Sequence, residues 1–322
     1  MVTLDDIRKA RERIKSVVIH TPLLPAKFGP PNVYFKCENL QRGGAFKIRG
    51  AYNCLAELGP EVRARGVTAY SSGNHAQAVA LSAKLFGVPA TIVMLNQSIA
   101  EKVAQTKAYG AEIIFAGDSS EDIKARAEEI ATERGMTLIP PFNYPGTIAG
   151  QGTVGVEILE QLPEVKTIVV PIGGGGLISG IATAVEETGP AIRVVGVEPE
   201  GAPTMFESLR AGQLVTLPGT NTIADGLKPV RAGDLTFTAV RRYVDEVVLV
   251  PDSAILEALV QLVTQEKLVV EPSGAASFAA VHSGKIAVSG PTVCVLSGGN
   301  IIHQFLGLLS SDNKMAEILA SR

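Results

Sequence analysis

The chain has 322 residues, of which 46% are hydrophobic and 19% are charged, and its formal net charge is −3. This length exceeds the size at which one hydrophobic core usually stops growing, so we expect one large α/β unit or two domains. The weak net charge and the lack of Lys/Arg-rich runs argue against nucleic acid or an anionic membrane as partners. No signal-like segment and no apolar run of membrane-spanning length occurs. We therefore expect a cytoplasmic protein that binds small molecules.

The chain opens with a helix signal. Thr3 followed by Asp6 resembles a capping box ahead of the run from Ile7 to Val17. These residues predict a surface helix at the N-terminus.

Beyond this helix, short β-rich runs alternate with longer helical patterns. The predicted strands are residues 33–37, 67–70, 91–95, 112–115, 167–171, 193–197, 246–250 and 292–296. The predicted helices include residues 75–86, 121–134, 177–187 and 253–266. The alternation predicts βαβ crossovers and a mainly parallel sheet, whose strands are continuous apolar runs because both faces are covered. Breaker-rich segments at 58–66 and 140–146 predict two crossings between domains.

The three cysteines, Cys37, Cys54 and Cys294, are an odd number without metal-ligand spacing. This pattern argues against a disulfide framework and is typical of a reducing compartment. We interpret all three as buried small hydrophobic side chains.

Residues 173–176 are four consecutive glycines between a predicted strand and a predicted helix. Without Cβ atoms, their backbone N–H groups can turn toward an anion, and the helix N-terminus adds the positive end of its dipole. The segment matches neither the dinucleotide fingerprint nor the Walker pattern. A flexible turn is the alternative, but a turn rarely needs four glycines. The segment therefore predicts a phosphate site.

Lys47 lies between Phe46 and Ile48 at the start of a predicted helix. Apolar neighbours partly desolvate its amine, which lowers the amine pKa and makes the neutral, nucleophilic form accessible. Schiff-base chemistry requires such an amine. An ordinary solvated lysine remains the alternative when the segment is considered alone.

Two further loops follow predicted strands. Residues 71–77 offer hydroxyls, an amide and free N–H groups at a helix start, which suit a carboxylate and a ring oxygen. An ordinary N-cap is the alternative, and His75 has no partner at i+4 for a metal. In residues 297–300, the Ser297 hydroxyl suits a heterocyclic nitrogen, with a simple turn as the alternative. Ligands bind at the carboxyl ends of parallel strands, so we expect these loops to carry the chemistry.

In this order, the four loops resemble those of the fold-type II pyridoxal-phosphate enzymes, specifically the serine/threonine dehydratase and serine racemase family. The resemblance covers nearly the whole chain and includes further motifs at residues 20–23, 35–41, 148–153, 222–226 and 271–275. It implies a two-domain α/β fold of the tryptophan synthase β type, in which each domain is an open, mainly parallel sheet flanked by helices. It also implies a homodimer. The expected domains are a large one from residues 1–65 and 144–322, and a small mobile one from residues 66–143.

The resemblance also implies roles for individual residues. Lys47 is expected to hold pyridoxal 5'-phosphate as an internal aldimine, with Phe46 packed on the pyridine ring. Asn74 is expected to contact the ring's 3'-oxygen, and Ser297 the pyridine nitrogen. The expected phosphate donors are Gly173, Gly174, Gly175, Gly176 and Leu177, and Gly226 is a further expected cofactor residue. The expected loop for the substrate carboxylate comprises Ser71, Ser72, Gly73, Asn74 and His75.

The implied reaction is β-elimination, in which a small β-hydroxy amino acid such as L-threonine or L-serine yields a 2-keto acid and ammonia. Lys47, displaced from the cofactor by the substrate amine, is expected to remove the Cα proton. Because Ser297 is neutral and cannot hold the pyridine nitrogen protonated, expulsion of the hydroxyl is favoured over a long-lived carbanion.

Several alternatives stay open. Serine racemisation is the closest, because Ser72 stands where racemases of this family place the base for the opposite face of Cα. A β-replacement enzyme such as cysteine synthase, and a non-catalytic amino-acid-binding module, are alternatives from other classes. Ala45 replaces a common serine and Ala76 a common glycine, so hydroxyaspartate and phenylserine types also stay open as substrates. The chain ends soon after Asn300, so we expect no C-terminal regulatory domain.

The resemblance also bears on a divalent cation. Racemase-like members bind one through a glutamate, a backbone carbonyl and an aspartate. Glu198 and Ala202 match the first two positions, but Thr204 occupies the third. Because a hard cation prefers carboxylate oxygens, we expect weak or absent binding at this position.

Overall fold

Two β-sheets organise the residues that the computed structural model describes, which are 1–189 and 191–307. The larger sheet has six strands in the order β1-β2-β10-β7-β8-β9, and the smaller has four in the order β5-β4-β3-β6. Neighbouring strands run parallel, except that β1 is antiparallel to β2. The strands are β1 Leu23–Pro25, β2 Val33–Lys36, β3 Val67–Tyr70, β4 Ala90–Met94, β5 Glu112–Phe115, β6 Thr137–Leu138, β7 Thr167–Pro171, β8 Arg193–Pro199, β9 Glu246–Val250 and β10 Thr292–Val295.

Helices cover both sheets. The α-helices are α1 Leu4–Ile14, α2 Lys47–Glu57, α3 Pro60–Ala64, α4 Asn74–Phe86, α5 Ala100–Ala108, α6 Ser120–Arg134, α7 Pro145–Gln161, α8 Gly176–Thr188, α9 Thr204–Ala211, α10 Asp234–Tyr243, α11 Asp252–Gln261, α12 Pro272–His282 and α13 His303–Leu306. Short 3-10 segments are η1 Glu38–Leu40, η2 Arg42–Gly44 and η3 Asp225–Leu227, and η4 Leu262–Glu266 is a π-helical turn. No helix within the described part of the chain is long and apolar enough to cross a membrane.

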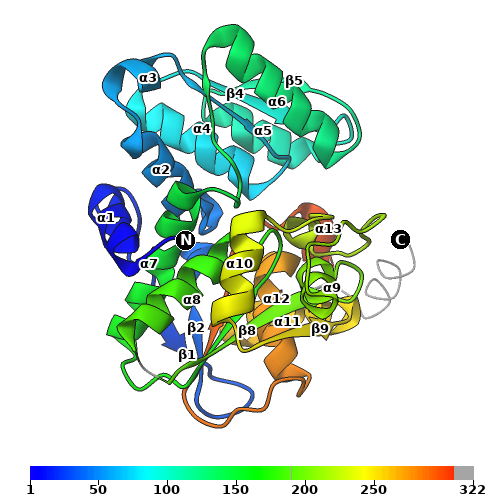
Figure 1. Cartoon of the computed structure of the whole chain (residues 1–322). Helices are drawn as coiled ribbons and strands as arrows, with labels where there is room; N and C mark the ends of the chain where they lie inside the picture. Colours follow the sequence, from blue (N-terminus) through cyan, green and yellow to red (C-terminus); the bar gives the residue numbers. More distant parts are fainter. Residues whose placement is uncertain (190, 308–322) are drawn as a thin grey trace.

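The larger sheet is buried on both faces, as its continuous apolar strands predict. In β7, Val169 faces a core that includes Phe278 of α12, while Val170 faces the opposite core with Ile181 of α8. The smaller sheet likewise packs against α4 on one face and α6 on the other. Figure 1 shows two groups of elements, with α3–α6 in the upper group and α8–α13 in the lower one. Helix α2 lies between them and contacts both α4 and α7.

The prediction of a two-sheet, mainly parallel α/β fold is confirmed. All eight predicted strands are present, with ends displaced by at most two residues. The capping box is also confirmed, because Thr3 Oγ1 accepts from Asp6 N and Asp6 Oδ2 accepts from Thr3 N. All three cysteines are buried and free, as expected.

The helix predicted at 253–266 is confirmed in extent, because α11 continues without a break into the π-helical turn η4, which ends where Lys267 adopts a left-handed φ of 64°. The expected end of the first helix was wrong, since this helix ends at Ile14 rather than Val17. Strands β1 and β6 and helix α7 were not predicted. The expected domain boundaries stay a prediction, and the end of the expected large domain, residues 308–322, lies outside the described residues.

Three of the four candidate loops begin at neighbouring strands. Strands β2, β10 and β7 are adjacent in the larger sheet, and the chain leaves their carboxyl ends toward residues 38–47, 297–300 and 173–176. The fourth loop, residues 71–73, follows β3 of the smaller sheet and leads into α4. The candidate site therefore draws residues from both sheets.

Candidate active site

Lys47 is the first residue of α2, and its amine meets apolar and carbonyl groups. Its Nζ donates to the Pro141 carbonyl oxygen at 2.9 Å and lies 5.0 Å from the centroid of the Phe46 ring. Burial lowers the pKa of the Lys47 amine to about 8. A substantial fraction of this amine is therefore neutral and nucleophilic at and above about pH 8, well below the usual range for lysine.

The backbone next to Lys47 is joined to the loop that contains Ser297. Phe46 N donates to Ser297 O at 3.1 Å, and Gly299 N donates to Gly44 O at 2.7 Å. Ser297 is only 5% exposed, and its hydroxyl lies 3.5 Å from the Ser273 carbonyl oxygen. These bonds bring Phe46, Lys47 and Ser297 into one small region.

The tetraglycine segment needs glycine because other groups approach it closely. A Cβ on Gly174 would lie 2.2 Å from the Phe142 ring, and one on Gly173 would lie 2.7 Å from Gly226 O. Gly175 has a left-handed φ of 90°, which L side chains rarely adopt. Helix α8 starts at Gly176, so its N-terminal N–H groups and dipole add to an anion-binding turn.

The Ser72 side chain is engaged within the smaller sheet. Its Oγ accepts from Leu95 N at 3.1 Å and from Ser98 Oγ at 2.7 Å. The neighbouring Ser71 Oγ accepts from Gly73 N at 3.2 Å, which shapes the turn into α4. The loop thus leads directly into the free N–H groups of a helix start.

His75 is buried and bound through one ring nitrogen. Its Nε2 lies 2.8 Å from Ile139 O, so Nε2 carries the proton, while Nδ1 is buried without a partner. Burial, followed by the charge of Lys47, lowers the pKa of His75 to about 3. The imidazole is therefore neutral at physiological pH and provides an unused acceptor.

Asn74 links the two sheets through its amide. Its Nδ2 donates to Glu271 Oε1, and its Oδ1 accepts from Asn300 Nδ2 at 2.9 Å. Asn300 Nδ2 also donates to Gly43 O at 2.8 Å, close to the Lys47 loop. Because an amide nitrogen has two hydrogens, Asn74 can donate to a ligand oxygen while it donates to Glu271.

Comparison with known proteins identifies the family. The model of the family described as pyridoxal-phosphate dependent enzymes matches residues 14–298. The chain belongs to this family. The expectations of a fold-type II enzyme and of pyridoxal phosphate as its cofactor are therefore confirmed.

Individual relatives within the family are ammonia-lyases and racemases. The chain is 46% identical over 306 residues to the L-threonine ammonia-lyase of Thermotoga maritima, which covers 94% of this chain and 76% of the relative. It is 43% identical over 304 residues to the L-threo-3-hydroxyaspartate ammonia-lyase of Saccharomyces cerevisiae, with 93% of both chains covered. The structure of maize serine racemase superimposes with a TM-score of 0.90 at 42% identity, covering 99% of this chain and 98% of that one. The expected enzyme class, a pyridoxal-phosphate dependent ammonia-lyase, agrees with these relatives.

The residues present fit the cofactor of this family. An amine at Lys47 whose pKa is lowered by burial, a turn at 173–176 in which a Cβ would collide, and a buried acceptor without a partner on His75 Nδ1 lie in linked loops. Their chemistry matches an aldehyde, a phosphate and a polar ligand group respectively.

The expected cation position does not fit a divalent ion. Both carboxylate oxygens of Glu198 accept backbone N–H groups at 2.8 Å, from Met205 and Phe206 at the start of α9. Thr204 Oγ1 donates to Pro229 O at 2.7 Å. Burial raises the pKa of Glu198 to about 8, against the two N–H donors. Glu198 therefore caps a helix, and no cluster of three or more His, Cys, Asp or Glu that could hold a metal occurs among residues 1–189 and 191–307.

Residues 139–143 contribute to the site in a way that their residue types do not predict. This segment was predicted only as a crossing between domains, but it supplies the carbonyls that bind His75 and Lys47 and the ring that contacts Gly174. Glu271, in the motif at 271–275, also lies in the site without a role predicted from the sequence. The available signal for Glu271 was its position as a charged residue in an apolar stretch, directly before Pro272. The backbone carbonyls of residues 139–143 have no such signal, because every residue carries one.

Proposed function

We propose that this enzyme catalyses β-elimination of a small β-hydroxy amino acid, such as L-threonine or L-serine, to a 2-keto acid and ammonia. The observation that carries the proposal is the Lys47 amine, whose pKa burial lowers to about 8 and whose loop is bonded to the Ser297 loop. The Thermotoga maritima relative, named L-threonine ammonia-lyase, supports the same reaction class.

The proposed cofactor site uses the residues expected from the sequence. Lys47 would bind the cofactor aldehyde, Phe46 would pack on its ring, and Ser297 would face the ring nitrogen. The phosphate would be held by Gly173, Gly174, Gly175, Gly176 and Leu177, with Gly226 alongside. When bound, the cofactor withdraws electrons from the substrate Cα and so makes its proton acidic.

In this proposal the Lys47 amine is also the base. An amine with a pKa of about 8 accepts a proton from Cα and returns it at a pH near its own pKa, which suits general acid–base catalysis. The Pro141 carbonyl, 2.9 Å from Nζ, directs the amine when the amine is free. Ser297 adds no charge at the ring nitrogen, which favours loss of the hydroxyl.

The proposed carboxylate site is the start of α4. Ser71, Ser72, Gly73, Asn74 and His75 form the turn and first residues of this helix. Free N–H groups at a helix N-terminus bind carboxylates well. The N-cap Gly73 has no side chain to block a substrate, and the nearest atom to a Cβ there would be Lys102 Nζ at 4.0 Å.

A second candidate activity is racemisation of serine. The maize relative is named serine racemase, and this chain has Ser72, a hydroxyl suited to deliver a proton to the opposite face of Cα. Ser72 Oγ already accepts from Leu95 N and Ser98 Oγ, which favours its role as a donor through its own proton. The yeast relative supports hydroxyaspartate as an alternative substrate in the same way.

We further propose that residues 66–143 form a small domain that closes over the substrate, and that the enzyme is a cytoplasmic homodimer. Strands β3 to β6 all lie within this segment and form the smaller sheet. Three free, buried cysteines are typical of a reducing compartment.

Incubation with L-serine and L-threonine, with keto acid and D-amino acid measured together, tests the proposal. We expect keto acid as the main product from wild type. Lys47→Ala is expected to lose the visible absorbance of the bound cofactor and about 1000-fold or more of the activity. Lys84→Ala, an exposed lysine on α4, is the matched control and is expected to behave as wild type. A coloured, active Lys47→Ala protein would refute the proposal.

A further inference from the structure

The first turn of helix α2 has charges of the sign that the helix dipole disfavours. Its first turn contains Lys47 and Arg49 and no acidic residue, and its N-cap, Phe46, makes no side-chain capping bond. Positive charges near a helix N-terminus are unfavourable, and an uncapped start frays readily. Contacts outside the helix must therefore hold the turn that presents Lys47.

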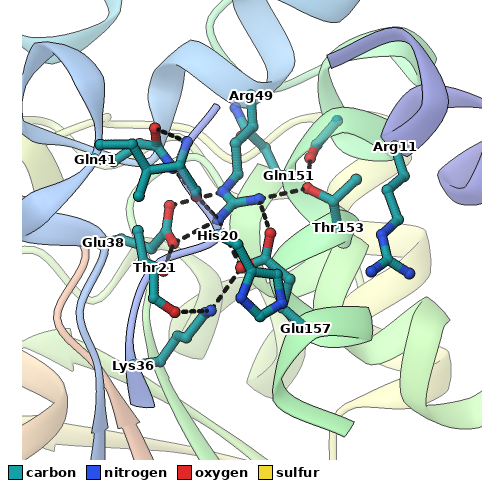
Figure 2. A network of polar contacts seen from close by, with 12 residues as sticks. Arg11, His20, Thr21, Lys36, Glu38, Gln41, Arg49, Gln151, Thr153 and Glu157 are labelled. Carbon is teal, nitrogen blue, oxygen red and sulfur yellow. Dashed lines mark hydrogen bonds and ion pairs between the residues drawn. The ribbon is translucent and has the colours of Figure 1, made fainter. Parts of the chain in front are cut away.

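Arg49 supplies those contacts through every nitrogen of its guanidinium. It is fully buried and forms two-pronged ion pairs with Glu38 of η1 and Glu157 of α7 (Figure 2). Nε and Nη2 donate to the two Glu38 oxygens at 2.8 Å each. Nη1 and Nη2 donate to the two Glu157 oxygens at 2.6 and 2.9 Å. Thr153 Oγ1 and Ile19 O accept further bonds at 3.1 and 3.3 Å.

The network is balanced in charge and closed to water. Lys36 Nζ donates to Glu157 Oε2 at 2.5 Å and to Thr21 O at 2.7 Å, so two cations face two carboxylates. Burial opposes the charge on Glu157, but Arg49 and then Lys36 outweigh it and hold the pKa of Glu157 below its usual value. Burial likewise opposes the charge on Arg49, yet its two carboxylate partners raise its pKa. The Arg49 side chain is thus permanently charged and fixed in one geometry.

Further contacts beside Arg49 connect the start of α2 to the tetraglycine segment. Beside Arg49, Gly50 N donates to Gln151 Oε1 of α7 at 3.2 Å, and a Cβ on Gly150 would lie 2.6 Å from Arg49 O. Helix α7 in turn packs tightly on α8, since a Cβ on Gly180 would lie 2.5 Å from Gly152 N. Because α8 starts at the tetraglycine segment, a rigid path runs from Arg49 to the proposed phosphate site.

We propose that Arg49 is a positioning residue for Lys47: its paired contacts with Glu38 and Glu157 fix the first turn of α2, and thereby the distance from the Lys47 amine to the tetraglycine segment. The inference rests on the proposed function, in which Lys47 binds the cofactor. Arginine is required because its planar fork meets two carboxylates with two bonds each, whereas lysine is a point charge with three donors. Arg49 itself touches neither substrate nor cofactor in this proposal.

A purely structural role for Arg49 makes a different prediction. If the network only stabilised the fold, its loss would lower the melting temperature as any destabilising substitution in the core does, without a separate effect on the reactivity of Lys47. The discriminating measurement is therefore the reaction of Lys47 with pyridoxal phosphate, followed by visible absorbance and by borohydride trapping of the covalent adduct at Lys47.

Arg49→Lys is compared with Leu55→Ala. Leu55 is fully buried on the same helix but away from its first turn, so Leu55→Ala creates a cavity without touching the Arg49 contacts. Both are expected to lower the melting temperature of the cofactor-free protein. Only Arg49→Lys is expected to slow cofactor capture, by about 10- to 100-fold, and to shift the pH at which the bound cofactor changes colour. Its kcat is expected to fall by a similar factor while KM stays within about 3-fold, because a misplaced amine impairs reaction more than binding.

Glu157→Gln provides a second measurement from outside α2 and decides the matter if Arg49→Lys does not fold. Glutamine keeps the shape of Glu157 but loses one of its two acceptors for Arg49, so slower capture is expected here as well. Capture and colour change as in wild type, in Glu157→Gln or in a folded Arg49→Lys, would overturn the positioning role. If Lys47→Ala itself bound cofactor normally, the proposed function would fail instead, whatever the result at Arg49.

Discussion

At the scale of single residues, the Lys47 amine combines reactivity with a cost in stability. Its pKa is about 8 in the folded chain, against a reference value near 10.4 for an unfolded lysine. The folded state therefore binds fewer protons than the unfolded state between these two values. The contribution of this amine to stability consequently decreases as pH falls from about 10.4 to 8, and stays low below pH 8.

This linkage predicts that cofactor-free Lys47→Met is more stable than the cofactor-free wild type at pH 7, by roughly 2–4 °C in melting temperature. Methionine fills a similar volume without a charge to desolvate.

In wild type, the rate of cofactor capture is expected to rise with pH and to level off above about pH 8, as the amine becomes neutral. Thermal unfolding and stopped-flow absorbance measure the two effects. A capture rate independent of pH from 6 to 9 would contradict the assignment of this pKa.

The residues predicted from the sequence are those whose chemistry depends on their residue type. Lys47 and Ser297 act through their side chains, and the four consecutive glycines act through the lack of one. Pro141 acts through its carbonyl oxygen, and Asn300 through a bond to a residue 226 positions away in the chain. Such contributions depend on tertiary structure, so residue type alone does not reveal them. The roles of all these residues stay predictions.

At the scale of elements, α7 and α8 meet along glycines. Gly180 approaches Gly152 N and Ile148 O so closely that a Cβ would lie 2.5 Å from each. Backbone atoms cannot move aside cheaply, so the two helices pack closely only because side chains are absent on this face. This contact between Gly180 and residues 148 and 152, here called the α7–α8 seam, sets the distance between the two helices. Helix α7 carries Glu157, and α8 follows the tetraglycine segment.

Gly180→Ala is therefore expected to destabilise the protein by about 2–3 kcal/mol or more, since it overpacks a buried backbone contact. Gly59→Ala is the matched control, because Gly59 has an ordinary φ of −58° and nothing within 4 Å of a Cβ. This second change is expected to stay within about 0.5 kcal/mol of wild type. Urea unfolding of both variants measures the difference. Equal stability of the two variants would show that the seam can relax.

The elements that sequence reasoning missed share physical causes. Strand β6 has two residues and β1 has three, so neither is long enough to give a pattern that predicts a strand. Helix α7 starts at Pro145 in a breaker-rich segment and contains four glycines, which suggest a loop although they serve packing. Buried strands such as β7 were predicted well because every residue is apolar or covered.

At the scale of the whole molecule, polar contacts near Glu271 join the parts of the chain that carry the two sheets. Lys102 of α5 pairs with Asp225 of η3, and Asn74 of α4 donates to Glu271 before α12. Burial raises the pKa of Glu271 to about 7, while Lys102 acts in the opposite direction and Asp225 adds to the rise. A raised carboxyl pKa means that the contribution of Glu271 to stability is present at low pH and is lost as pH rises through about 7.

Lys102→Met is expected to loosen the contact between the sheets, because it removes a buried cation that faces two acids. We expect faster hydrogen exchange in α4 and α5 and about 10-fold lower kcat/KM. Lys107→Met, an exposed lysine on the same helix, is the control and is expected to change neither quantity. Hydrogen-exchange mass spectrometry and steady-state kinetics measure the two effects. Unchanged hydrogen exchange in Lys102→Met would show that the ion pair does not stabilise the contact between the two sheets.

The connection from β6 to α7 has an evolutionary consequence. Loops usually tolerate insertions and drift in sequence. In residues 139–143, however, Ile139, Pro141 and Phe142 contact His75, the Lys47 amine and Gly174 respectively, so an inserted residue would displace at least one of these contacts. Length variation among functional descendants of this enzyme is therefore expected at other surface turns, whereas this short stretch keeps its residue count.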